Sequence, residues 1–310
     1  MNKLLDGVLE SVSQVLLGKE QQLKLALCCL LARGHLLIED LPGMGKTTLA
    51  QCLARVLGLS YQRVQFTSDL LPGDILGTSI FDQNKASFRF HPGPIFTQLL
   101  LADEINRSTP KAQSALLEAM EERQVSIDSE SHPLPNPFFV IATQNPLSQA
   151  GTYVLPESQL DRFLMCISLG YPSPEAERQL LLGQDPRQRM PSINPLLSVE
   201  DLAKVQEQVE EVHVSDALVA YVQRLVHFTR ENQSFTHGLS PRAAMALIKA
   251  AKSWALLHGR QHVLPDDVQA VFASVVEHRV EGGTALKASD TEGAQSLSRL
   301  ALNSVDVLGL

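Results

Sequence analysis

One segment constrains the fold of this chain more than any other, the glycine-rich stretch Leu41-Pro42-Gly43-Met44-Gly45-Lys46-Thr47-Thr48. It lies between a short apolar run at residues 35–39 and a helical pattern at residues 47–57. A strand, a glycine-rich loop and a helix in this order form the setting in which a loop wraps a phosphate group. The stretch therefore predicts a phosphate-binding loop at the start of an α/β domain.

Four more short apolar runs follow the loop, and helical patterns separate them. Short strands that alternate with helices indicate a parallel sheet buried on both faces. One intervening helix, expected over residues 112–122, also shows its start, because Thr109 can cap it and Pro110 suits the first helical position. The four runs are residues 61–66, 99–103, 138–143 and 165–169.

The pattern changes after Leu169. A proline-containing joint at residues 171–174 precedes helical patterns that begin at serine, a favoured N-cap, and no strand pattern follows. We therefore predict an α/β domain over residues 1–170 and an all-α domain over residues 171–310. Its tail is expected to be a linker at 281–296 and a short helix at 297–310. The four serines are Ser173, Ser198, Ser215 and Ser240.

Composition and charge argue against several classes of protein. The 310 residues carry a formal net charge of −8, whereas a protein that binds duplex DNA normally presents a lysine- and arginine-rich face. The N-terminus lacks the basic and apolar segments of a signal peptide, and no apolar run approaches the roughly 20 residues that span a bilayer. The four cysteines have no metal-ligand spacing and are expected in the core. We predict a cytoplasmic protein without membrane insertion or a nucleic-acid partner.

Each residue type in the loop answers a need of a bound triphosphate. Gly43 and Gly45 allow backbone N–H groups to turn toward an anion, and the next helix presents its positive end. Lys46 is expected to reach the β- and γ-phosphates, and the Thr47 hydroxyl can bind Mg²⁺. Asp40 stands where the full pattern has glycine, so a turn that binds nothing is the alternative. The predicted nucleotide-binding residues are Pro42, Gly43, Met44, Gly45, Lys46, Thr47 and Thr48.

Two acids at the end of the 99–103 run supply the second half of the predicted site. Asp103 and Glu104 would lie at the carboxyl edge of a parallel sheet, where ligands bind. Asp103 is expected to hold Mg²⁺, and Glu104 to orient and deprotonate the attacking water. Alone, the pair would more simply be a solvated strand end. Together with the loop, it predicts hydrolysis of a nucleoside triphosphate.

Several further segments carry a resemblance to a known family. They are residues 101–107 (LADEINR), 139–146 (FVIATQNP), 151–153 (GTY), 155–157 (LPE), 159–163 (QLDRF) and 238–243 (GLSPRA). In sequence and order they resemble the MoxR family of AAA+ ATPases, from about residue 15 to residue 280. The resemblance implies an αβα nucleotide domain followed by a helical lid, ATP and Mg²⁺ as cofactors, and assembly into a ring, usually a hexamer.

The resemblance also implies roles for residues outside the loop. Asn145 would be the polar sensor beside the γ-phosphate, although Asn145-Pro146 alone would indicate a turn. Arg162 would be the arginine finger that a neighbouring subunit inserts, with Arg107 as a second candidate. An ion pair between Arg162 and Asp161 is the alternative.

Arg242 is informative even without the family. It falls in the first turn of a helix, where the dipole disfavours a cation, so an anionic partner is expected. The resemblance makes that partner the γ-phosphate, with Arg242 as the lid sensor, and a nearby carboxylate is the alternative. The predicted catalytic set is Lys46, Glu104, Asn145, Arg162 and Arg242.

Two hairpins are expected at residues 77–93 and 124–135, with Ile80, Phe81 and Ile127 available for contact. The first resembles the extra hairpin that interrupts a helix in this AAA+ branch. Both hairpins could grip a client, and surface hairpins without a role are the alternative. The family usually works with adaptors that contain a von Willebrand factor A domain. We therefore expect an ATPase that remodels or activates a partner protein. A nucleic-acid motor and the motor subunit of a metal chelatase are the alternatives.

Overall fold

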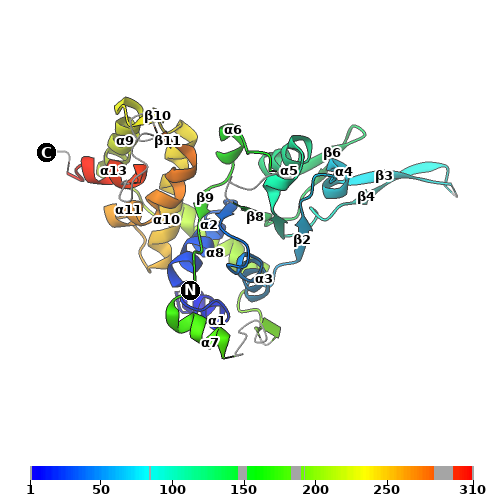
Figure 1. Ribbon diagram of the computed structural model, residues 1–310, viewed down its shortest axis with the longest axis horizontal. Coiled ribbons are helices and arrows are strands. Elements are labelled where there is room, and N and C mark those ends of the chain that lie inside the picture. Colours follow the sequence, from blue (N-terminus) through cyan, green and yellow to red (C-terminus); the bar gives the residue numbers. More distant parts are fainter. Residues whose placement is uncertain are drawn as a thin grey trace.

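The computed structural model describes residues 2–83, 85–145, 152–182, 190–191, 193–282 and 296–308. A five-stranded sheet forms its centre, in the order β2-β5-β8-β1-β9, and all its pairings are parallel. The predicted parallel α/β sheet is thus confirmed (Figure 1). The strands are β1 (Leu36–Glu39), β2 (Tyr61–Gln65), β5 (Leu99–Asp103), β8 (Phe139–Gln144) and β9 (Met165–Ile167).

Alternate residues of the central strands enter two different cores. Leu99 and Leu101 of β5 pack with one set of helices, and Leu100 packs on the other face with a second set. Helices α2 (Glu20–Leu31) and α3 (Lys46–Val56) cover the first face, and α1 (Asn2–Ser13) packs on these two helices. Helices α4 (Pro72–Leu76) and α5 (Pro110–Glu122) cover the second face. This double burial explains why β5 is a nearly continuous apolar run, whereas β2, at the edge of the sheet, is exposed at three of its five residues.

Helix α5 begins as its sequence predicts. Thr109 Oγ1 accepts a hydrogen bond from the Ala112 N–H (3.4 Å), and Pro110 occupies the first helical position. The cap fixes the register of the helix that carries Glu121 near its other end.

The lid is helical, as predicted, and its serine caps are confirmed. Ser173, Ser198, Ser215 and Ser240 each accept a backbone N–H at the start of a helix. A small antiparallel pair, β10 (Phe235–His237) and β11 (Glu281–Gly282), adds to these helices. Such short strands have no visible alternation in sequence. The lid helices are α7 (Pro174–Leu181), α8 (Val199–Glu211), α9 (Asp216–Glu231), α10 (Pro241–Leu257), α11 (Pro265–Val276) and α13 (Leu297–Ser304).

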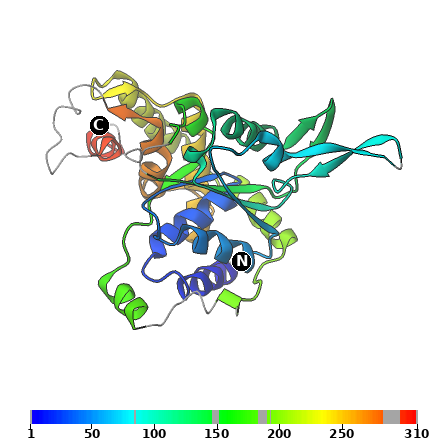
Figure 2. The ribbon, with the colours of Figure 1, turned by 45° about the vertical axis from the view of Figure 1, so that its right-hand side comes forward.

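The lid packs on α2 without a break in the core. Gln206 of α8 donates to the Leu30 carbonyl (3.0 Å), and Ser253 of α10 donates to the Cys28 carbonyl (2.8 Å). Cys28, Cys29 and Cys52 are buried as predicted, and Cys166 is half-buried. Helix α2 therefore lies between the sheet and the lid helices (Figure 2). The domain boundary near residue 170 stays a prediction, and one hydrophobic core spans both sides of it.

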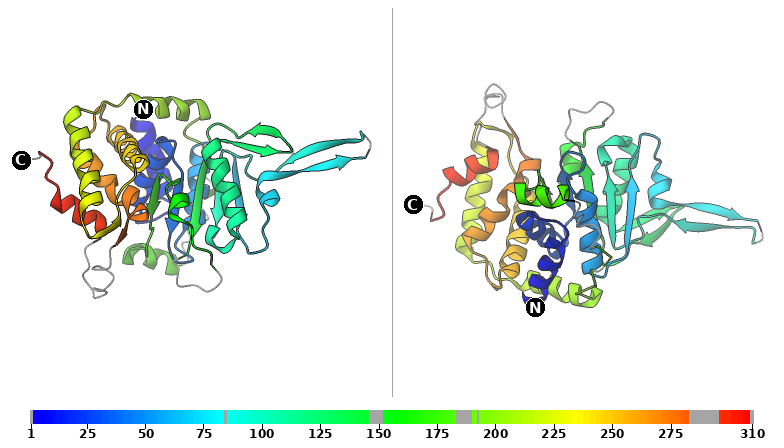
Figure 3. Two further views of the ribbon diagram at one scale, coloured as in Figure 1. Left: turned by 90° about the horizontal axis from the view of Figure 1, so that it is seen from above. Right: turned by 60° about the horizontal axis from the view of Figure 1, so that its bottom comes forward.

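Both predicted hairpins are present: β3 (Gly77–Asp82) with β4 (Ser87–Pro92), and β6 (Gln124–Ile127) with β7 (Glu130–Pro133). The first projects far from the body, at the end opposite the lid (Figure 3). Ile80 and Phe81 are exposed on it, whereas Ile127 is half-buried against the core.

Most of the predicted 281–296 linker lies outside the described residues, and the predicted tail helix is α13. Among the described helices, none combines the length and the apolar character that a membrane span requires.

Candidate nucleotide-hydrolysis site

The phosphate loop joins the carboxyl end of β1 to the start of α3. Gly43 (φ +85°) and Gly45 (φ +94°) take the left-handed conformation that favours glycine. Lys46 is buried, and its Nζ donates to the Asp40 carbonyl (2.6 Å) and to Asn145 Oδ1 (3.2 Å). Pro42 and Gly43 are exposed, whereas Met44, Thr47 and Thr48 are half-buried. The loop therefore presents its backbone to solvent above a buried lysine.

The charges around Lys46 suit an anionic ligand bound together with a cation. Burial lowers the pKa of the Lys46 ammonium, while Asp40, Asp103 and Glu104 act in the opposite direction. A triphosphate could offer the ammonium new partners, and a divalent ion could offset the added negative charge.

Asp103 and Glu104 lie at the end of β5, held by Thr143 of the adjacent strand β8. Thr143 Oγ1 donates to Asp103 Oδ1 (2.6 Å) and accepts the Glu104 N–H (2.8 Å). Asp103 Oδ2 also accepts from Nη2 (2.6 Å) and Nε (3.1 Å) of Arg63. One hydroxyl thus fixes both acids relative to the sheet edge.

Among the described residues, three polar side chains contact the Glu104 carboxylate. Gln65 Nε2 donates to Oε2 (2.7 Å), Asn145 Nδ2 donates to Oε1 (3.0 Å), and Arg107 Nε lies 3.3 Å from Oε2. Glu104 itself has φ +56°, which turns the chain sharply into the short helix η1 (Ile105–Arg107). Asn145 therefore connects Lys46 to Glu104 through one side-chain amide.

The donor set fits a magnesium ion. Mg²⁺ prefers oxygen ligands and is usually held by one or two carboxylates together with substrate phosphates. The half-buried Thr47 hydroxyl at the start of α3 and the Asp103 carboxylate offer this chemistry. Asp103 would then exchange part of its contact with Arg63 for the ion.

Three polar residues of this site were not singled out from the sequence. Arg63 and Gln65 belong to β2, where Gln65 lies directly opposite Asp103, and Thr143 belongs to β8. Gln65 and Thr143 lie near the carboxyl ends of their strands, so the rule that ligands bind at that edge could have indicated them.

A cavity of about 230 Å³ adjoins the loop and was also missed. Lys19, Thr48 and apolar side chains line it, between the α1–α2 connection, the loop and α7. Its apolar lining residues include Val15, Leu16, Leu17, Met44, Pro172, Ala176 and Leu180. A cavity beside the loop has the position that a nucleotide base would need.

Arg162 and Arg242 share a different carboxylate. Arg162, which follows α6 (Glu157–Leu160), lies with Nη2 3.1 Å from Glu121 Oε2. Arg242 Nη2, at the start of α10, pairs with Glu121 Oε1. Asp161 pairs instead with Arg279 of the short helix η3 (Glu277–Arg279), at 2.7 Å. The anion expected for Arg242 is therefore a carboxylate in this chain, and Arg162 has a partner other than Asp161.

This arginine pair lies at the edge of the sheet opposite the phosphate loop. The cleft that contains it is also lined by His35 and Leu164, which precede β1 and β9. The loop follows the other end of β1, whose four residues span about 13 Å. The structure thus brings Lys46, Asp103, Glu104 and Asn145 together. Arg107 lies with this group, whereas Arg162 and Arg242 do not.

Comparison with known proteins identifies the family profiles and the fold that this chain matches. Residues 35–165 match the family profile described as "ATPase family associated with various cellular activities (AAA)", and residues 227–299 match "AAA lid domain". A crystal structure of a proposed ATPase from Cytophaga hutchinsonii superimposes with a TM-score of 0.87 at 36% identity, covering 98% of this chain and 95% of that one.

Three relatives share most of their length with this chain. The uncharacterized protein YeaC of Bacillus subtilis is 44% identical, over 90% of this chain and 88% of its own. Chaperone MoxR1 of Mycobacterium tuberculosis is 44% identical over 89% and 75%, and Protein MoxR of Paracoccus denitrificans is 34% identical over 87% and 86%.

The fold, the site and these matches together define an AAA+ ATPase with a helical lid. Within that class, the chain belongs to the MoxR family.

Proposed function

We propose that this chain hydrolyses ATP within a ring of identical subunits, a hexamer, and uses the resulting movement to remodel or activate a partner protein in the cytoplasm. The observation that carries the proposal is the division of the predicted catalytic set. Lys46, Glu104 and Asn145 lie at one edge of the sheet, and Arg162 and Arg242 lie at the other. Two copies placed head to tail would complete one site.

The chemistry at the loop follows from its contacts. Lys46 would turn from the Asp40 carbonyl and Asn145 toward the β- and γ-phosphates. A magnesium ion held by Thr47 and Asp103 would neutralise charge on the phosphates. Glu104 would accept a proton from the attacking water, and Asn145 would hold that water beside Glu104. In-line phosphoryl transfer needs chiefly such positioning and charge stabilisation.

The two arginines would act on the ATP of a neighbouring subunit. A head-to-tail contact is heterologous, so repeating it generates a closed ring when the rotation permits. Arg162 and Arg242 share one carboxylate, which leaves positive charge for a phosphate that enters the cleft. Arg107 contacts Glu104 of its own chain, which favours Arg162 as the finger.

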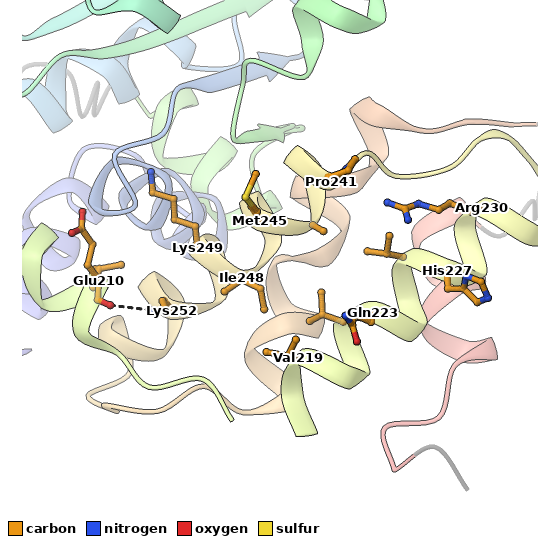
Figure 4. Close-up of a pocket in the computed structure, with 14 residues that line it drawn as sticks. Glu210, Val219, Gln223, His227, Arg230, Pro241, Met245, Ile248, Lys249 and Lys252 are labelled. Carbon is orange, nitrogen blue, oxygen red and sulfur yellow. Dashed lines mark hydrogen bonds between the residues drawn. The ribbon is translucent and has the colours of Figure 1, made fainter. Parts of the chain in front are cut away.

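A groove in the lid supports assembly on the same side of the molecule. It has a volume of about 900 Å³ and lies between α8, α9 and α10 (Figure 4). Met245 is 67% exposed and, with Lys249, lines both this groove and the cleft of Arg162 and Arg242. A neighbour whose phosphates reach Arg242 would therefore also cover Met245.

The output of such a ring would be mechanical. The projecting β3–β4 hairpin exposes Ile80, Phe81 and Phe88, and Phe88 is 73% exposed. These side chains could contact a client, and one relative is named a chaperone. The family resemblance points to a von Willebrand factor A domain adaptor as the partner.

Co-purification with the Glu104→Gln variant tests this proposal. The variant keeps the shape of the side chain but lacks the base. It should therefore bind ATP and remain assembled as a ring, but hydrolyse ATP at least about a hundredfold more slowly than wild type. Candidate von Willebrand factor A domain proteins should co-purify with it in ATP and not in ADP. Equal recovery in both nucleotides, or none in either from an intact ring, would refute the adaptor claim. Turnover within about threefold of wild type would refute the role of Glu104.

A further inference from the structure

The residue that departs from the phosphate-loop pattern has a specific set of contacts. Asp40 is buried, and its Oδ2 accepts the Gly170 N–H (2.7 Å) and the Ser168 hydroxyl (3.2 Å). Its Oδ1 accepts the Leu41 N–H (2.9 Å), and its carbonyl accepts from Lys46 Nζ (2.6 Å). A glycine at this position could make only the last of these contacts.

A buried lysine contacts the same segment from another side. We call this segment, residues 168–171 between β9 and the lid, the hinge. Lys19 lies just before α2, and its Nζ donates to the carbonyls of Leu169 (2.6 Å), Gly170 (3.0 Å) and Tyr171. All three ammonium protons thus have partners at the point where the chain passes from β9 into the lid. Lys19 also lines the cavity beside the loop, but these contacts direct its charge to the hinge.

We propose that Asp40 and Lys19 are positioning residues that couple the phosphate loop to the hinge at residues 168–171. We call these two residues the hinge clamp. The inference rests on the proposed ATPase function and adds to it a route from the phosphates to the lid. Lys46 and the hinge are both bound by Asp40, the first through the main chain and the second through the side chain.

Nucleotide binding would remove one of the hydrogen bonds that hold Asp40 in place. When Lys46 turns toward the phosphates, the Asp40 carbonyl loses its buried donor, and residue 40 can adjust. The side chain of Asp40 transmits that adjustment to the Gly170 amide. Gly170 has φ +64°, a left-handed conformation that favours glycine, so the turn of the chain at this point depends on the Gly170 backbone.

The charges of the clamp explain why both members are needed. Each ion is buried, and a buried ion is tolerated only where hydrogen bonds or an opposite charge compensate it. Asp40 binds N–H and O–H donors of residues 168 and 170, while Lys19 binds carbonyls of residues 169–171. The same short segment therefore supplies hydrogen-bond donors to Asp40 and acceptors to Lys19.

Hydrogen exchange on the full chain tests the clamp directly. In wild type, the Gly170 amide should be protected, and a non-hydrolysable ATP analogue should change its exchange rate. In Asp40→Gly, exchange should be about tenfold faster or more, because the carboxylate that accepts the Gly170 N–H is removed. The response to the analogue should also disappear. In Asp40→Asn the increase in exchange should be smaller, because a neutral amide oxygen can replace the charged acceptor. Asp40→Gly is the sharper variant, since it restores the common loop residue.

Steady-state kinetics separate coupling from nucleotide binding. Asp40→Gly should bind ATP within about threefold of wild type and lose about tenfold in kcat, since hinge movement and not the loop backbone is affected. Lys19→Met should likewise lower kcat about tenfold and change ATP affinity by no more than about threefold. The double variant should be little worse than either single one, because the two residues act as one unit. Asp6→Asn, an exposed acid on α1, is the matched control and should change neither readout.

Two results would refute the proposed coupling through Asp40 and Lys19. One is a Gly170 amide whose exchange is unchanged in Asp40→Gly and in Lys19→Met. The other is an Asp40→Gly protein with wild-type kcat and a wild-type response of residues 168–171 to the analogue. If wild type binds the analogue but never hydrolyses ATP, the proposed function fails, while the exchange comparison still decides the clamp.

Discussion

Mixing two inactive variants tests whether Glu104 of one subunit and Arg162 of its neighbour form one catalytic site. Glu104→Gln removes the base and leaves Arg162 intact, whereas Arg162→Ala removes the finger and leaves Glu104 intact. In this chain Arg162 pairs with Glu121, in a cleft at the amino ends of β1 and β9, while Glu104 bonds to Asn145 at the carboxyl edge. If the finger acts on a neighbour, some sites in mixed rings contain both wild-type residues.

The expected recovery follows from counting sites. In an equal mixture, a site is complete when its loop comes from an Arg162→Ala subunit and its neighbour is a Glu104→Gln subunit. Each condition holds with a probability of about one half, so about a quarter of head-to-tail sites are complete. Activity should return to about a quarter of wild type if sites turn over independently.

A second mixture provides the matched control. Wild type mixed equally with the Glu104→Gln/Arg162→Ala double variant should also give about a quarter of wild-type activity if the arginine acts between subunits. If both residues act within one chain, this mixture gives about one half and the mixture of single variants gives none. ATP turnover is measured after dye-labelled subunits show complete exchange. If the two mixtures have about the same ATP turnover, the arginine acts between subunits. If the mixture of single variants has no activity while the control mixture is active, action between subunits is refuted.

Three further predictions follow from individual contacts. Lys46→Ala should weaken ATP binding about a hundredfold or more in calorimetry, because the phosphates lose their buried cation; unchanged affinity would contradict the loop assignment. Met245→Asp should dissociate rings in light scattering, whereas Leu308→Asp, at an exposed site of the tail, should not. Burial lowers the pKa of His35 to about 4 from 6.5, and its ring accepts the Val140 N–H. The unfolded chain therefore binds a proton that the folded chain does not, and stability falls as pH drops from 6.5 toward 4. Between pH 7.5 and pH 5, urea unfolding should show a loss about 2 kcal/mol larger for wild type than for His35→Asn; equal losses would contradict the shift.

The parts of the site that the sequence predicts are those set by local spacing. Gly43, Gly45 and Lys46 are defined by their place between a strand and a helix, and Glu104 by the strand that it ends. Thr109 and the serine caps are also local, since each bonds to an amide three residues ahead. Such features depend on a few consecutive residues and need no knowledge of the tertiary arrangement.

The contacts of the site that the sequence did not predict depend on which strands and helices are neighbours in the fold. Gln65 reaches Glu104 only because β2 pairs with β5, and that pairing crosses a long stretch of sequence. Glu121 meets Arg242 because α10 of the lid begins beside the end of α5. Asp161 likewise bonds to Arg279 rather than to its chain neighbour Arg162. None of these pairs has a spacing that sequence periodicity could reveal.

The arginine cleft leaves positive charge and a hydrogen-bond donor unmatched among the described residues. Arg162 and Arg242 share one carboxylate, and Arg162 Nε is buried without a hydrogen-bond partner in the described part of the chain. Leaving a buried donor unpaired costs about 1–3 kcal/mol, and the start of α10 further disfavours the cation there. A neighbour's γ-phosphate would relieve both penalties by supplying acceptors and negative charge. Under the proposed ring arrangement, subunit contact and nucleotide binding should therefore strengthen each other, because the same arginines serve both.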